Sequence, residues 1–217
     1  MLHLPISSGP CVVACHGLGA SKDSDKYALL ARVFAGAGLA LARFDFRGCG
    51  DSTGAEEETT VATRVTDVRA VLARLRAHPR LDGRFGLLGS SLGGFVALQV
   101  AASSEAPMPV VTWNAPASLA DLLRRPPPPA GDAGQALREE LGRGEYLETP
   151  PGVRQHLIVQ GTADDVVRAE HADLLRARGG DDCALLLLEG GDHRLSEPAH
   201  RERAALESLR WFQRRWA

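Results

Sequence analysis

Residues 85–94 read FGLLGSSLGG, an apolar run that ends in alternating glycine and serine, and FVALQVAASS follows at 95–104 with helical spacing. The pattern predicts a strand that turns sharply into a helix, with Gly89, Ser91 and Gly93 at the turn. Small residues on both sides let the strand and the helix approach closely, and the turn exposes the serine hydroxyl at the helix N-terminus. Gly-x-Ser-x-Gly in this setting indicates a nucleophile; a glycine-serine turn without chemistry is the alternative.

Short apolar runs alternate with longer helical patterns along the rest of the chain. This alternation is typical of parallel strands joined by crossover helices, and it predicts an α/β fold with a mostly parallel sheet of about six to seven strands flanked by helices. The expected strands are residues 11–15, 39–44, 84–89, 109–113, 156–160 and 184–189. Ligands in such sheets bind beyond the carboxyl ends of the strands, so candidate site residues are sought there.

Residues 114–152 interrupt this alternation between the fourth and fifth expected strands. The segment is too long for a plain connection, and its run Pro126–Pro129 is incompatible with a helix interior. Two short helices are expected, near residues 119–124 and 132–141. We therefore expect a single domain over residues 1–217 that carries residues 114–152 as a small cap.

The composition narrows the classes of partner. The chain has 217 residues, of which 24% are charged, and a net charge of −2. Without a basic stripe, no nucleic-acid partner is expected. No apolar run approaches the roughly 20 residues of a membrane span, and the first residues do not resemble a leader, which favours the cytoplasm. The cysteines lack metal-ligand spacing, so we expect no metal and no cofactor. A monomer or a homodimer is expected.

A serine nucleophile needs a base and an orienting carboxylate. His193 is the preferred base because it follows the last expected strand on a glycine-rich loop. The carboxylate should lie between the serine and the histidine in the chain, and Asp164 and Asp165 both follow the fifth strand there. Asp164 is preferred, because the turn before it carries its side chain back over the strand end, whereas Asp165 is better placed to cap the following helix.

Backbone N–H groups complete the candidate site. Leu92 follows the serine, so its N–H faces the position of a developing oxyanion. The HGLG turn after the first strand offers a second donor, the N–H of Leu18. His16 lies too early in this turn to act as the base, and we expect it to brace the loop.

The segments HGLGASKDS, RFDFRGCGDS, LGSSLGG, GTADDVV and GGDH together resemble the successive signatures of the α/β-hydrolase superfamily. They are most similar to the group that contains cinnamoyl and feruloyl esterases and serine-aminopeptidase-like hydrolases. The resemblance implies Ser91 as nucleophile, Asp164 as acid, His193 as base, and Leu18 and Leu92 as oxyanion donors. Two departures stand out: the opening antiparallel strands are absent or reduced to one within LHLPI, and the cap is small and rich in proline.

The cap should decide the substrate, since in this fold it lies above the serine. Its apolar residues are expected either to line an acyl pocket or to pack the cap onto the sheet; the pocket candidates are Trp113, Leu119, Leu122 and Tyr146. The sequence suggests no basic pocket for a nucleotide-bearing thioester. The expected function is a serine hydrolase that cleaves a small carboxylic ester through an acyl-enzyme. Peptide, amide or thioester hydrolysis by the same residues, or a noncatalytic binding protein on this fold, are the alternatives.

Overall fold

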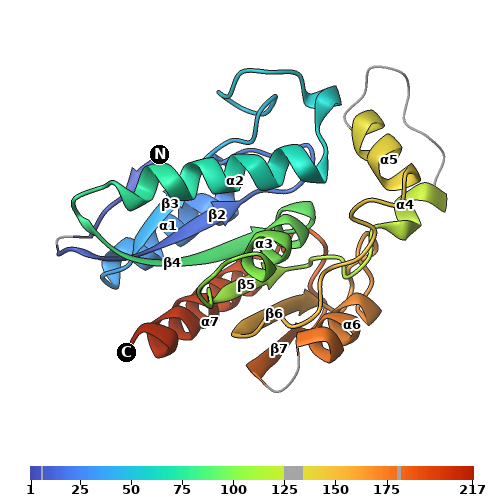
Figure 1. The fold of residues 1–217 in the computed structure, drawn as a ribbon. Coiled ribbons are helices and arrows are strands. Elements are labelled where there is room, and N and C mark those ends of the chain that lie inside the picture. The colour runs from blue at the N-terminus through green and yellow to red at the C-terminus, as the bar shows by residue number, and fades with distance from the viewer. Residues whose placement is uncertain (6, 125–133, 180–181) are drawn as a thin grey trace.

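The computed structural model describes residues 1–5, 7–124, 134–179 and 182–217. Its centre is a seven-stranded sheet in the order β1-β3-β2-β4-β5-β6-β7, in which only β1 runs antiparallel to its neighbour (Figure 1). The strands are β1 (Leu2–His3), β2 (Gly9–Cys15), β3 (Ala40–Arg43), β4 (Leu81–Ser90), β5 (Val110–Trp113), β6 (His156–Gly161) and β7 (Cys183–Leu188). The six expected strands are all present, which confirms the α/β fold class.

The short strand β1 lies within the LHLPI segment and pairs antiparallel with β3. Leu2 pairs with Ala42 and His3 with Leu41 of β3, and the terminal ammonium of Met1 donates to the carbonyl of Arg43 at 2.7 Å. This pairing covers the N–H and C=O groups of β3 that would otherwise form an open edge.

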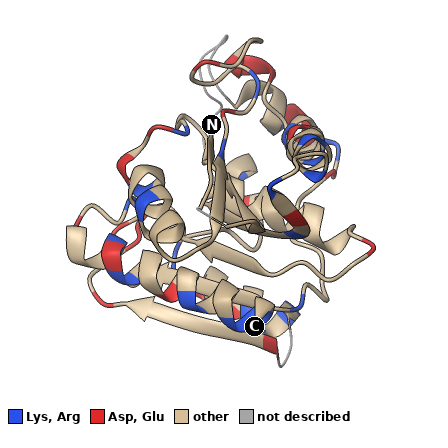
Figure 2. Cartoon of the chain, turned by 90° about the vertical axis from the view of Figure 1, so that its left-hand side faces the viewer, with Lys and Arg blue, Asp and Glu red and all other residues tan. Residues whose placement is uncertain are grey.

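Helices cover both faces of the sheet, as parallel strands require. One face carries α1 (Asp25–Gly36) and α7 (Pro198–Trp216), whose apolar residues share a core cluster with Val12, Leu88 and Trp113. The other face carries α2 (Val61–Arg76), α3 (Leu92–Ala102) and α6 (Glu170–Gly179). Figure 2 shows charged residues mainly on the helices and loops and few along the strands. The sheet is therefore the buried layer from which the loops of the site project.

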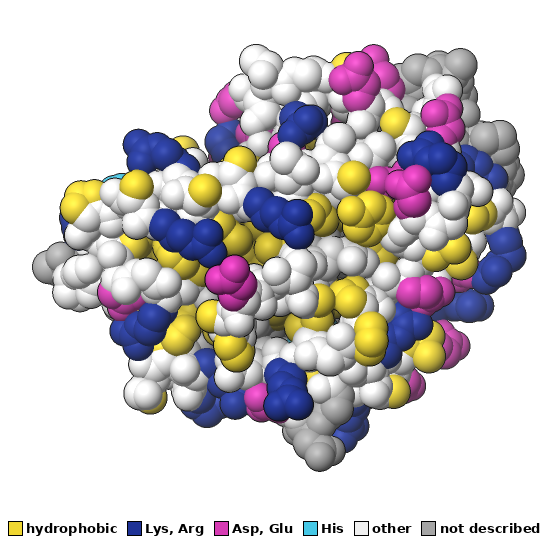
Figure 3. Space-filling view, in the orientation of Figure 1, with side chains coloured by type: hydrophobic (Ala, Val, Ile, Leu, Met, Phe, Trp, Pro, Cys, Tyr) yellow, Lys and Arg dark blue, Asp and Glu magenta, His cyan; other side chains and the backbone are white. Residues whose placement is uncertain are grey.

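Charges of both signs are interspersed on the face seen in Figure 3, in keeping with the net charge of −2. Among the described residues, no helix combines the length and the apolar character needed to cross a bilayer.

The two ends of the segment between β5 and β6 are hydrogen-bonded to each other. Leu119 N donates to Leu147 O and Thr149 N to Ala117 O, both at 2.8 Å, and Ser118 and Glu148 form an antiparallel bridge. Between these ends the structure places α4 (Ala120–Arg124) and α5 (Gln135–Gly142). Two short helices are thus present, while the proline run between them lies outside the described residues.

A buried carboxylate ties this segment to the body of the protein. Glu140 of α5 is 1% exposed, and its oxygens accept from Val61 N at 2.6 Å and Ala62 N at 3.0 Å. These amides belong to the first turn of α2, where N–H groups lack partners within the helix and the helix dipole favours an anion. The contact fixes α5 against the start of α2.

Candidate active site

Ser91 forms the sharp turn between β4 and α3. Its backbone has φ 55° and ψ −128°, a sparsely populated conformation that costs about 1–3 kcal/mol, and its N–H donates to Trp113 O at 2.9 Å. A β-carbon at Gly89 would collide with the backbone of Gly93, and one at Gly93 with the carbonyl of Cys15. Both glycines are therefore required by the close packing of strand, helix and neighbouring loop, as the sequence predicts.

The three side chains predicted to act together lie in one hydrogen-bonded chain, although they are far apart in sequence. The distance from Ser91 Oγ to His193 Nε2 is 3.1 Å, and that from His193 Nδ1 to Asp164 Oδ2 is 2.8 Å. With its proton on Nδ1, the imidazole donates to Asp164 and accepts from the serine hydroxyl. This is the arrangement that lets a histidine take a proton from a serine.

The environment of Asp164 fixes its orientation. Its side chain is buried, and its second oxygen, Oδ1, accepts from Val166 N at 2.9 Å and Val167 N at 2.8 Å. The neighbouring Asp165 is exposed to solvent. The structure thus brings Asp164, and not Asp165, to the imidazole.

Asn114, which the sequence analysis did not single out, connects three strand ends. This buried residue directly follows β5, and its Oδ1 accepts from Gly161 N at 2.8 Å. Its Nδ2 donates to Asp192 O at 3.0 Å and to His193 O at 2.9 Å. Its position directly after a strand is the signal in the sequence that points to Asn114, although the same residue also begins the insertion.

The turn after β2 lies directly against Ser91. A β-carbon on Gly17 would lie 3.3 Å from Cβ of Ser91, so a larger residue would have to displace the serine side chain by a few tenths of an ångström. Within the described residues, neither Leu18 N nor Leu92 N donates a hydrogen bond to another protein group. Both N–H groups are thus without a partner in that part of the chain.

A buried arginine holds this turn in place. Arg64 of α2 is fully buried, stacks over the ring of Phe46 at 4.4 Å and donates to His16 O at 3.1 Å. His16 is buried as well, its Nε2 accepts from Phe46 N at 3.1 Å, and burial lowers the pKa of its imidazole to about 4. His16 therefore braces the loop as a neutral ring. The contribution of Arg64 was missed, because an arginine within a helical pattern is usually exposed.

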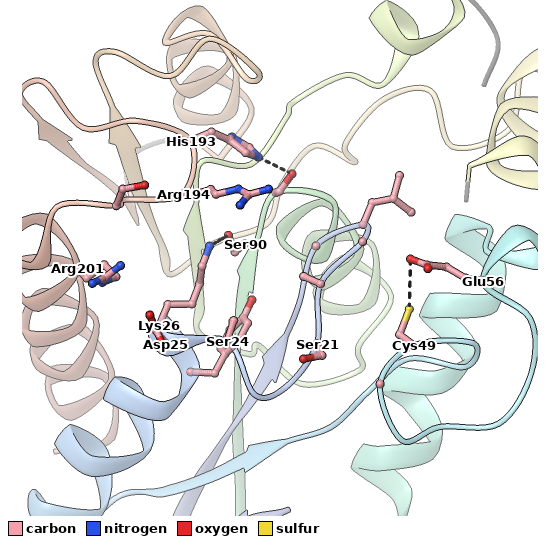
Figure 4. Close-up of a pocket in the computed structure, with 18 of the residues that line it drawn as sticks. Ser21, Ser24, Asp25, Lys26, Cys49, Glu56, Ser90, His193, Arg194 and Arg201 are labelled. Atoms are coloured by element: carbon pink, nitrogen blue, oxygen red, sulfur yellow. Dashed lines mark hydrogen bonds between the residues drawn. The ribbon is translucent and has the colours of Figure 1, made fainter. Parts of the chain in front are cut away.

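A cavity of about 750 Å³ opens beside Ser91 and His193 (Figure 4). The turn after β2, the start of α1, the loop before Glu56 and the loop between β7 and α7 form its walls. Among the described residues, Lys26, Arg194 and Arg201 contribute positive charge to its lining, and Lys26 Nζ donates to Ser90 Oγ at 2.9 Å. The volume is in the range of small-molecule sites.

Comparisons with known proteins agree with this geometry. Residues 8–143 match the model of the family described as serine aminopeptidase, S33. The chain belongs to this family. The matched residues of the S33-family hydrolase include Ser91 but end before Asp164 and His193.

Two curated relatives are similar over much of the hydrolase. An uncharacterised protein of Mycobacterium tuberculosis is 28% identical over 220 residues, which cover 97% of this chain and 72% of the relative. The human mitochondrial palmitoyl-protein thioesterase ABHD10 is 29% identical over 153 residues, 70% of this chain and 47% of the relative.

Solved structures share the fold of the hydrolase. The esterase Est1E of Butyrivibrio proteoclasticus, solved with ferulic acid, has a TM-score of 0.84 at 18% identity and covers 100% of this chain and 94% of its own. The esterase domain of a Rhodothermus marinus protein has a TM-score of 0.74 at 25% identity, with 98% and 91% covered. These likenesses confirm the resemblance to α/β hydrolases.

The apolar residues expected to line an acyl pocket do not border the cavity of the hydrolase. Trp113 is fully buried, packs with residues of α7 and donates from Nε1 to Ser208 Oγ at 3.0 Å, so its assignment to a pocket is wrong. Leu119 is also buried, but in the core cluster on the other face of the sheet, and Leu122 and Tyr146 pack partly exposed against that cluster. Packing the insertion onto the body, the alternative raised above, describes these residues better.

Proposed function

We propose that this protein is a serine hydrolase that cleaves a carboxylic ester of a small molecule through an acyl-enzyme intermediate. The observation that carries the proposal is the continuous hydrogen-bonded chain from Ser91 through His193 to Asp164. The strained backbone of Ser91 and the cavity beside its hydroxyl support it further. Such strain persists only where the surrounding structure enforces it, and it is concentrated at active sites.

In the proposed reaction, His193 Nε2 takes the proton of Ser91 as Oγ attacks the ester carbonyl. The negative charge that develops on the carbonyl oxygen is stabilised by the free N–H groups of Leu18 and Leu92. The imidazolium then protonates the departing alcohol. A water molecule, deprotonated by the same imidazole, hydrolyses the acyl-serine ester and releases the acid. Asp164 holds the imidazole tautomer and stabilises its positive charge without taking the proton.

The family's description, serine aminopeptidase, suggests a peptide substrate with a free N-terminus. The basic residues of the cavity favour an ester over such a peptide. An aminopeptidase substrate carries a free α-ammonium group next to the scissile bond. Lys26, Arg194 and Arg201 would repel this group. A thioester is the second candidate, since the relative ABHD10 is described as a palmitoyl-protein thioesterase. The same residues would perform that reaction, with a thiol as the leaving group.

A fluorophosphonate probe tests the proposal together with simple substrates. The folded protein is expected to become labelled on Ser91, as located by peptide mass spectrometry, and to hydrolyse 4-nitrophenyl butyrate. Acyl thioesters of similar chain length and alanine 4-nitroanilide, assayed in parallel, separate esterase, thioesterase and aminopeptidase activity. A folded protein that neither reacts with the probe nor turns over any of these compounds would instead be a binding protein on this fold.

Replacing Asn114 by alanine is expected to lower kcat for 4-nitrophenyl butyrate by about 10- to 100-fold, with a smaller change in KM. The substitution removes both hydrogen bonds that hold the backbone at Asp192 and His193, so the imidazole loses its position relative to Ser91 Oγ. Gln99→Ala is the matched control, because Gln99 also donates a side-chain amide to a backbone carbonyl, that of Glu148, away from the cavity. Equal kcat losses in the two variants would contradict the role of Asn114.

A further inference from the structure

Three cations from separate parts of the chain surround one side of the cavity. Lys26 lies in the first turn of α1, Arg194 directly follows His193, and Arg201 lies near the start of α7 (Figure 4). In the part of the chain that the structure describes, none of the three forms an ion pair with a carboxylate. The sequence suggests no basic pocket for a nucleotide-bearing thioester, and it does not reveal this cluster either, because the three cations meet only through the packing of α1 against α7.

These positions are electrostatically unfavourable for cations in the absence of a ligand. The first turns of α1 and α7 expose N–H groups and carry the positive ends of their helix dipoles, and a cation there opposes the dipole. Burial, together with repulsion from Arg194 and Arg201, lowers the pKa of Lys26 to about 8. A bound anion would interact favourably with the helix N-termini and would offset the repulsion among the three cations.

The carboxylates near this side form no ion pair with the three cations among the described residues, although Asp25 precedes Lys26 in α1 and the charges of Asp192 and Asp164 partly offset the lowering of the Lys26 pKa. Glu56 lies at the opposite wall, where its Oε1 accepts from Cys49 Sγ at 4.0 Å, as Figure 4 shows. Asp25 is exposed and forms no ion pair with any described residue. The cavity is thus polarised, with its positive side formed by α1, α7 and the loop that carries His193.

We propose that this positive side binds an anionic group of the substrate, so that the preferred substrate is an ester with a second group that is a carboxylate or a phosphate. The proposal rests on the function proposed above and specifies its substrate class. Lys26 and Arg194 flank the reacting residues, the first through its bond to Ser90 Oγ and the second as the neighbour of His193. An anion held between them would fix the ester relative to Ser91. Arginine and lysine side chains are the usual partners of carboxylates and phosphates.

Matched pairs of substrates test this preference. The first pair places the anion on the acyl side. Mono-4-nitrophenyl glutarate is compared with the same compound in which the free carboxylate is converted to a methyl ester. The second places it on the alcohol side: 4-acetoxybenzoate is compared with its methyl ester. For the side that the pocket recognises, Arg201→Gln and Lys26→Gln are each expected to lower the ratio of kcat/KM for the anionic over the neutral ester by roughly ten-fold or more.

Arg203→Gln is the control, because it removes the same charge from the same helix at an exposed position that does not border the cavity. This variant is expected to leave the ratio unchanged for both pairs. A ratio that falls equally in the Arg201 and Arg203 variants, or in neither, would overturn the proposal while leaving ester hydrolysis intact.

Measuring the binding of free anions tests the proposed anion site without requiring that the protein hydrolyse an ester. Glutarate and inorganic phosphate are titrated calorimetrically into Ser91→Ala protein, with and without Arg201→Gln. Weaker binding of either anion in the double variant supports the proposal even if no ester is hydrolysed, and the anion bound more tightly identifies the preferred group. Absence of binding by both, together with an unchanged ratio, overturns it.

Discussion

Substitution of Ser91 by alanine is expected to lower kcat for 4-nitrophenyl butyrate by about 10⁴-fold or more. The variant loses the oxygen that would attack the carbonyl, while the proposed oxyanion donors, Leu18 N and Leu92 N, remain in place. Only the weak acceleration that binding and these donors provide for attack by water should persist. The measurement is steady-state hydrolysis with enough protein to quantify a residual rate, after confirming by circular dichroism that the variant is folded.

Ser103→Ala provides the matched control for this result. Ser103 is exposed at the C-terminal end of α3, the helix that begins after Ser91, and does not border the cavity beside it. Its removal should leave kcat within about two-fold of the unmodified protein, as for most surface substitutions away from an active site. If Ser91→Ala retained more than a tenth of the activity, Ser91 could not be the nucleophile.

The second large effect is expected at Asp164. Asp164→Asn should lower kcat by about 10⁴-fold, because an amide group facing Nδ1 favours the tautomer with its proton on Nε2. Such an imidazole cannot accept the proton of Ser91 Oγ. Asp165→Asn should change kcat by no more than a few-fold, since its exposed side chain makes no contact with the imidazole.

Asp165→Asn serves as the control for Asp164→Asn, since any effect on kcat that comes only from removing a negative charge should be present in both variants. Both substitutions remove one negative charge from the same loop, so a difference in kcat reports the contact with His193. Thermal unfolding of each variant shows how far the loss of the carboxylate that accepts from Val166 N and Val167 N weakens the fold. A larger loss of activity in Asp165→Asn would refute the assignment of the acid.

The parts of the site that could be predicted from the sequence follow local rules. The turn at Ser91 is signalled by the glycines on either side of it: Gly89 is required by its contact with Gly93 within the turn, and Gly93 by its contact with the end of β2, the strand beside β4 in the sheet. Asp164 and His193 could be found because the ends of parallel strands lie at one edge of a sheet. Each prediction needed only the position of a residue relative to a strand.

The parts that could not be predicted depend on side chains meeting across the fold. Arg64 reaches the turn after β2 from the middle of a helix, and Lys26, Arg194 and Arg201 share a cavity only because α1 packs against α7. The error at Trp113 has a different cause. Side chains alternate along β5, and Trp113 lies with Val111 on the face covered by α7, so a position near the strand end does not direct it toward the serine.

The hydroxyl, the imidazole and the carboxylate follow β4, β7 and β6 of one buried sheet, whereas the cationic wall of the cavity comes from the starts of two helices and a single loop residue. Under the substrate preference proposed above, charge reversal at Lys26 or Arg201 is expected to change selectivity without altering the backbone that positions Ser91, His193 and Asp164. For protein engineering, the residues proposed to react and the two helix residues proposed to bind the substrate therefore lie on separate elements and can be varied independently.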